Sequence, residues 1–264
     1  MSFNLSLEER NQLKDTNLKG AKNIFFGSTL AQFTNAPLKK TCLIDDKLDP
    51  AQVLQLVHRR QINHVIQNSF QSLEEKIQIM SALDKDTYSY YDIEFDLLIK
   101  KNRVKILKFF TSTEREKVIS KTFEFLQIDP SSSRNTKVQS VLEEMVMNAQ
   151  ISAPTIRRSD KVLLSEIKIE QSDDLVSFSL IDRYGALNTE KFLMKVESGL
   201  SVGMSNAINY GRGGAGVGSS IIFNFVDSLY LGCIPNKITR VSIVMPYNKS
   251  EKKLELIQKS LNIV

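Results

Sequence analysis

Glycine is dense in one segment, Gly211-Arg-Gly-Gly-Ala-Gly-Val-Gly218, which holds five glycines in eight residues. Glycines let a backbone approach phosphate oxygens closely, and the apolar helix predicted to follow would present its positive end to them. No Lys follows as in a Walker A loop, and no parallel-strand unit surrounds the segment as in a Rossmann fingerprint. The segment is therefore interpreted as a phosphate-binding loop or as a flexible linker. Arg212 would reach a phosphate in the first case and face solvent in the second.

A predicted helix upstream carries two polar residues one turn apart, Glu144 and Asn148. They lie at the edge of an apolar stripe with helical spacing, made of Val138, Val141, Leu142, Met145 and Ala149. A carboxylate at such an edge can act as a general base, and an amide oxygen can bind Mg²⁺. The alternative is an exposed Glu and a helix-ending Asn, because E-x-x-x-N is frequent by chance.

Two predicted strands follow that helix, over residues 161–169 and 175–181, around the polar turn at 171–174. In the second strand, Val176, Phe178 and Leu180 alternate on one face, and Asp182 continues their parity. A buried carboxylate needs a hydrogen-bond partner, and an adenine amino group would serve as one. The alternative is an Asp that ends a strand before a turn at Gly185.

The remainder of the second half predicts a short helix at 188–196, a lid-like segment at 197–210 and a hairpin over 229–245. Thr239 lies early in the last strand of that hairpin. A terminal helix is predicted within residues 249–264.

The first half predicts a smaller α/β unit over residues 21–108, after a polar arm at 1–20. Strands are expected at 23–26, 41–45 and 62–66, and helices after Asp49 and after the capping box Ser72-Leu-Glu-Glu75. The unit weakly resembles a response-regulator receiver, with Asp45 and Asp46 in place of an acidic site. Because fold analogy alone does not carry function, a degenerate receiver-like or interaction domain is the preferred interpretation.

Composition excludes few classes. The formal net charge of +5 is mild and interspersed, so it does not imply a nucleic-acid partner. Cys42 and Cys233 are far apart in apolar runs, which indicates reduced thiols rather than a disulfide or a metal site. No run approaches the roughly 18 apolar residues of a membrane span, and the start does not read as a signal sequence, so a cytoplasmic protein without a membrane partner is expected.

Taken in order, the motifs of residues 109–248 resemble the GHKL ATPase fold of gyrase, histidine kinases and related ATPases. The segment LEEMVMNAQISAP, residues 142–154, is most similar to the anti-sigma factor serine-kinase branch. The resemblance implies a two-layer α/β sandwich, with helices on one face of a mixed sheet, preceded by the smaller unit. It also implies ATP and Mg²⁺ as cofactors and a sigma factor or anti-sigma antagonist as partner. A homodimer is left open.

The resemblance also assigns roles to single residues. It implies that Glu144 is the catalytic base and Asn148 the Mg²⁺ ligand, and that Asp182 binds the adenine amino group, with Gly185 in the same nucleotide-binding motif. It further implies that Gly214, Gly216 and Gly218 belong to a phosphate-binding loop and that Thr239 supports the adenine site. The family pattern D-x-G-x-G is altered here, because Tyr184 and Ala186 replace its glycines. The expected function is thus an ATP-binding regulatory protein that acts as a serine/threonine kinase, or a non-catalytic sensor or scaffold on the same fold.

Overall fold

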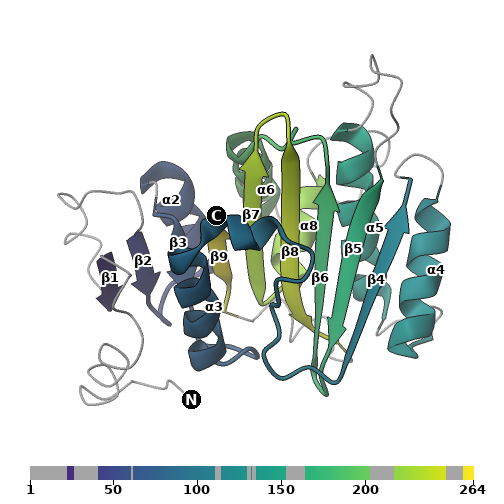
Figure 1. The fold of residues 1–264 in the computed structure, drawn as a ribbon. Coiled ribbons are helices and arrows are strands. Elements are labelled where there is room, and N and C mark those ends of the chain that lie inside the picture. Colours follow the sequence, from purple (N-terminus) through teal and green to yellow (C-terminus); the bar gives the residue numbers. More distant parts are fainter. Residues whose placement is uncertain are drawn as a thin grey trace.

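A computed structural model describes residues 23–26, 41–60, 62–110, 114–129, 132, 135–152, 164–202, 217–247 and 258–264. These residues form an α/β protein built on one continuous mixed sheet with the strand order β1-β2-β3-β9-β7-β8-β6-β5-β4 (Figure 1). The fold class predicted from the sequence is therefore confirmed at the α/β level.

The first half contributes the parallel end of the sheet. Its elements are β1 (Asn23–Phe26), β2 (Thr41–Ile44), α2 (Pro50–Arg60), β3 (His64–Ile66), α3 (Leu73–Lys85) and the 3₁₀ helix η2 (Thr87–Tyr91). Asp49 and Gln52 cap α2 reciprocally, since each side chain accepts the other's backbone N–H, at 2.8 and 2.9 Å. Ser72 Oγ accepts the Glu75 N–H at 3.2 Å, so the predicted capping box does begin α3.

The second half contributes the antiparallel end. Its elements are β4 (Arg103–Phe109), α4 (Arg115–Leu126), α5 (Thr136–Ser152), β5 (Ser165–Gln171), β6 (Leu175–Asp182), α6 (Thr189–Val202), α8 (Val217–Phe225), β7 (Ser228–Ile234), β8 (Ile238–Pro246) and β9 (Ser260–Ile263). The predicted stripe of α5 is buried at every position, so it does face the core. The predicted hairpin is present as β7 and β8, which pair in register from Ser228 with Val244 to Ile234 with Ile238.

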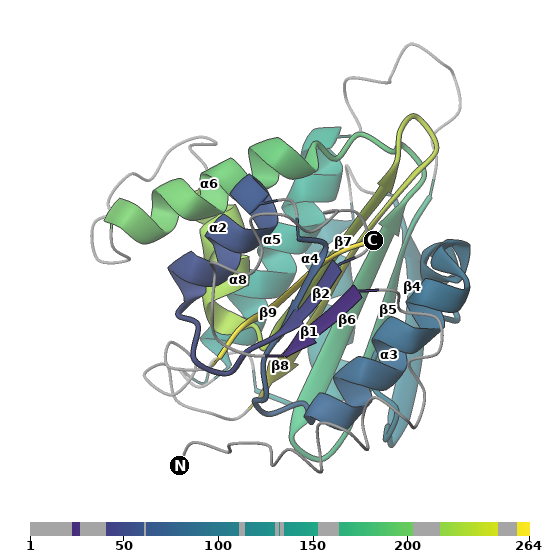
Figure 2. The same cartoon turned by 90° about the vertical axis from the view of Figure 1, so that its left-hand side faces the viewer.

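Helices cover both faces of the sheet, so the two-layer expectation is wrong. One core joins the sheet to α2, α4, α5, α6 and α8, and a second core joins the opposite face to α3 and residues 90–98 (Figure 2). Neighbouring residues of one strand divide between the cores, with Leu43 in the first and Cys42 and Ile44 in the second. The extra layer exists because several strands are apolar on both faces, a pattern typical of strands that are covered twice.

Three further differences concern the domain organisation. β1, β2 and β3 lie side by side in chain order, whereas receiver-like folds use the order 2-1-3-4-5. The predicted boundary at 108/109 divides β4, which pairs with β5 along its whole length. Residues 260–263 form a strand instead of a helix, because they fill the gap between β3 and β7. The rest of the predicted terminal helix, 249–257, and the arm at 1–20 lie outside the described residues.

Residues 86–98 are held on the second face by a buried guanidinium. Arg240 has no exposed surface and donates to the carbonyls of Tyr90, Asp92 and Phe95 at 2.6, 2.5 and 3.0 Å. Lys168 Nζ adds a hydrogen bond to the Glu94 carbonyl at 2.8 Å. Burial of a charge is costly unless its donors are satisfied, and here the backbone of this segment satisfies them together with the hydroxyls of Ser179 and Ser242.

Candidate functional site

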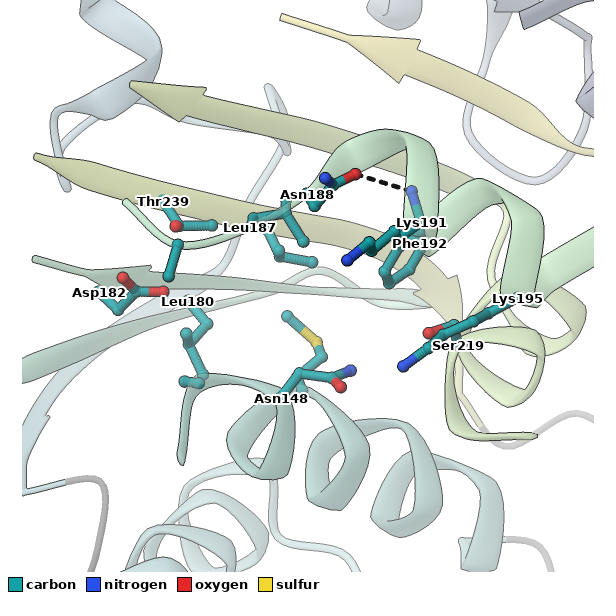
Figure 3. Close-up of a pocket in the computed structure, with 14 residues that line it drawn as sticks. Asn148, Leu180, Asp182, Leu187, Asn188, Lys191, Phe192, Lys195, Ser219 and Thr239 are labelled. Atoms are coloured by element: carbon teal, nitrogen blue, oxygen red, sulfur yellow. Dashed lines mark hydrogen bonds between the residues drawn. The ribbon is translucent and has the colours of Figure 1, made fainter. Parts of the chain in front are cut away.

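A cavity of about 330 Å³ lies between α5, α6, the start of α8 and the ends of β6 and β8. Its lining includes three residues that the sequence singled out, Asn148, Asp182 and Thr239. Figure 3 shows Asp182 and Thr239 at one end, Asn148 from α5 in the middle, and Lys195 and Ser219 at the other end. Residues almost a hundred positions apart in the chain thus share one cavity.

Asp182 and Thr239 are paired across neighbouring strands at one end of the cavity (Figure 3). Asp182 is only 3% exposed, and its Oδ1 accepts the backbone N–H groups of Tyr184 at 2.9 Å and Gly185 at 3.3 Å. Burial raises the pKa of Asp182, while these two N–H groups and the Thr239 hydroxyl oppose the increase. The carboxylate thus both ends the strand, as the simpler interpretation held, and lines the cavity.

Gly185 is not among the residues that line the cavity; it packs against the turn between β7 and β8. Its φ is +59°, and a Cβ there would lie 2.5 Å from the Lys237 backbone nitrogen and would also overlap the Ile234 carbonyl. The Gly185 carbonyl accepts the Asn236 N–H at 3.1 Å. A glycine is needed because the turn after Asp182 packs directly onto the β7–β8 turn in a left-handed conformation.

Glu144 lies one turn before Asn148 on α5, half-buried, but it is not among the residues that line the cavity. Its carboxyl group instead packs against Gly218, where a Cβ would overlap it. Burial raises the pKa of Glu144, and the charges of Arg115 and Lys195 oppose the increase. Gly218 was expected in a phosphate loop. It lies in the first turn of α8, and because it has no side chain, the Glu144 carboxylate can pack against it.

Sequence reasoning missed Lys191 and Lys195, which line the cavity from α6. It also ended that helix too early, since α6 continues to Val202 through the expected start of the lid. Gly199 suggested a loop, but it lies within α6 and packs against Ser220 of α8. A Cβ at position 199 would overlap the Ser220 Oγ, so a larger residue would not fit there. The spacing of the two lysines, four residues apart in a predicted helix, was the signal that could have found them.

Three of the candidate residues, Arg212, Gly214 and Gly216, lie outside the described residues. Within the described part of the chain there is no cluster of three or more His, Cys, Asp or Glu side chains that could hold a metal ion. Asp45 and Asp46 accept the backbone N–H groups of Lys47 and Asn68, respectively, at 2.9 and 2.6 Å, as structural turn residues do. Among the described residues the two cysteines are free thiols, as predicted.

Comparison with known proteins does not place the chain in a family. No protein-family description matches it, and a search of curated proteins finds no significant match. None of the helices in the described ranges is long and apolar enough to cross a membrane.

Proposed function

We propose that this protein is an ATP-binding regulatory protein of the GHKL type, with the cavity between α5 and α6 as its nucleotide site. The observation that carries the proposal is the convergence of Asn148, Asp182 and Thr239 in one cavity. They come from three separate motifs whose order the GHKL resemblance requires. A cavity of about 330 Å³ is also within the size range of small-molecule sites.

The lining suits an adenine nucleotide. Asp182 offers a buried carboxylate that can accept from an exocyclic amino group, and Thr239 supports it. Asn148 offers an amide oxygen, a ligand type that Mg²⁺ accepts together with phosphate oxygens and waters. Mg²⁺ bound there would neutralise part of the phosphate charge. Selectivity for the base would thus come from β6 and β8, and cation binding from α5.

Glu144 is the residue best placed to act as a base if phosphate is transferred. Its carboxylate is half-buried on the same helix as Asn148, one turn away. A raised pKa brings a carboxylate closer to neutral pH, where it accepts a proton from a hydroxyl more effectively. A serine hydroxyl of a protein partner would be the acceptor. The partner class, a sigma factor or its antagonist, is supported only by the resemblance of residues 142–154.

A non-catalytic nucleotide sensor or scaffold is the second candidate. The Glu144 carboxylate packs against Gly218 and does not line the cavity, so the base is separated from the ligand space in this conformation. Tyr184, which replaces a family glycine beside Asp182, is buried with 8% exposure. Both features fit binding without phosphate transfer.

Calorimetric titration with Mg-ATP tests the proposal. Wild-type protein should bind ATP, and Asp182→Asn should weaken binding by about tenfold or more, because its amide would present a donor to the adenine amino group. Asp173→Asn, in the exposed β5–β6 turn, is the matched control and should bind like wild type. No binding of ATP to wild-type protein would refute the proposal. Binding without hydrolysis, and without phosphate transfer to a serine-containing partner, would select the sensor.

A further inference from the structure

Lys191 and Lys195 both line the cavity from α6, Lys195 at the end opposite Asp182 and Lys191 between the two ends, near Asn188 (Figure 3). They are one turn apart on α6, so both ammonium groups project from the same side of the helix. Both residues are exposed, and neither takes part in an ion pair within the described ranges. The cavity therefore has an acidic end and a basic end.

The position of Lys191 is electrostatically unfavourable for α6 itself. Asn188 begins the helix by accepting the Lys191 backbone N–H at 2.8 Å, which places the lysine in the first turn. The N-terminal end of a helix carries partial positive charge and disfavours a cation. An anion bound in the cavity would relieve this repulsion.

A second helix end faces the same space. Ser219, in the first turn of α8, lines the cavity and is 4% exposed. The close approach of Gly199 to Ser220 fixes α6 against α8, so the lysines and the start of α8 keep their relative positions. Lys195 lines the cavity, and its charge also opposes the increase in the pKa of Glu144, so this lysine acts on both the candidate base and the cavity.

We propose that Lys191 and Lys195 bind the phosphates of the nucleotide, so that α6 makes the cavity selective for nucleoside polyphosphates over nucleosides. This inference rests on the proposed function, because it takes Asp182 as the base-binding end. The order of Asp182 and the two lysines in the cavity then matches the order of base, sugar and phosphates in a nucleotide. Ser219 and the α8 N-terminus add hydrogen-bond donors beside the lysines.

Calorimetry with ATP and with adenosine tests the inference, using wild type, Lys191→Gln, Lys195→Gln and the double variant. Each single change should weaken ATP binding by about tenfold, and the double change by about a hundredfold, since a hydrogen bond to a charged group is lost each time. Adenosine affinity should change by no more than about twofold in any variant. Lys121→Gln, an exposed lysine of α4, is the control and should leave both affinities unchanged.

The outcomes separate this inference from the proposed function. If wild-type protein binds adenosine and ATP but the double variant binds ATP as well as wild type does, the lysines do not bind phosphate. An equal loss of adenosine and ATP affinity in a folded variant would show a structural role and also overturn the inference. If wild-type protein binds neither ligand, the nucleotide site itself is refuted.

Discussion

The contact between Glu144 and Gly218 can be tested by a double-mutant cycle. Gly218→Ala places a methyl group where the Glu144 carboxyl now lies, so the carboxyl must move. Moving a half-buried side chain out of its packed position costs about 1–2 kcal/mol. The gain of alanine over glycine near the start of a helix is about 0.5 kcal/mol. The single variant should therefore be less stable than wild type by about 1 kcal/mol.

Removing the carboxyl reverses the sign. In a Glu144→Ala background the space is open, and Gly218→Ala should stabilise the protein by about 0.5 kcal/mol. The coupling energy between the two positions is then about 1.5 kcal/mol, well above the ~0.5 kcal/mol expected for independent sites. Urea unfolding of the four proteins, followed by circular dichroism with an unchanged slope, gives this energy.

Glu143 provides the matched control for the cycle. It is adjacent to Glu144 on α5, but its carboxylate pairs with Arg115 at 3.2 Å instead of contacting Gly218. Gly218→Ala and Glu143→Ala should therefore be additive within about 0.5 kcal/mol. Additivity in the Glu144 cycle as well would refute the packing described for the first turn of α8.

Three further outcomes follow from the same structure. Gly185→Ala should destabilise by about 2–4 kcal/mol in urea unfolding, because the methyl group meets backbone atoms at a positive φ; a loss below about 0.5 kcal/mol would contradict this geometry. Arg240→Met should cost about 3–5 kcal/mol and increase amide hydrogen exchange in residues 86–98, since three backbone carbonyls lose the donor that the buried guanidinium provides; unchanged exchange there would count against this role. Burial lowers the pKa of His64 from 6.5 to about 4, so the unfolded state binds a proton more tightly and stability should fall as pH drops through that interval. His64→Gln should remove at most about 3 kcal/mol of this pH dependence, and an unchanged slope would exclude His64 as its source.

Local sequence patterns predicted those helices and strands that are specified by one apolar face or by a capping signal. The stripe from Val138 to Ala149 and the capping box at Ser72 are local signals, and both elements formed where these signals indicated. The order of Asn148, Asp182 and Thr239 in the chain also indicated residues that the structure brings together. These residues could be placed from the sequence because each lies at the end or along the edge of a predicted helix or strand.

Other features depend on partners distant in the sequence. Gly199 reads as a loop residue until Ser220 is placed beside it, and only then is a glycine within α6 explained. The second covered face depends on Arg240, whose partners are about 150 residues away in the chain. Residues 260–263 have no intrinsic strand signal strong enough to override a helical pattern, and their conformation is set by β3 and β7. Propensity cannot anticipate such tertiary effects.

The position of β9 determines when, during synthesis of the chain, the two ends of the sheet can be joined. Strand β9 separates β3 from β7, so among the described residues the two ends of the sheet are joined only once residues 260–263 have been synthesised. Until that moment the edges of β3 and β7 are both unpaired and open to other chains, a known hazard for nascent proteins. We therefore expect ribosome-bound chains that stop before residue 260 to recruit chaperones or to aggregate. Insertion of β9 between β3 and β7 would then join the two ends of the sheet in one step.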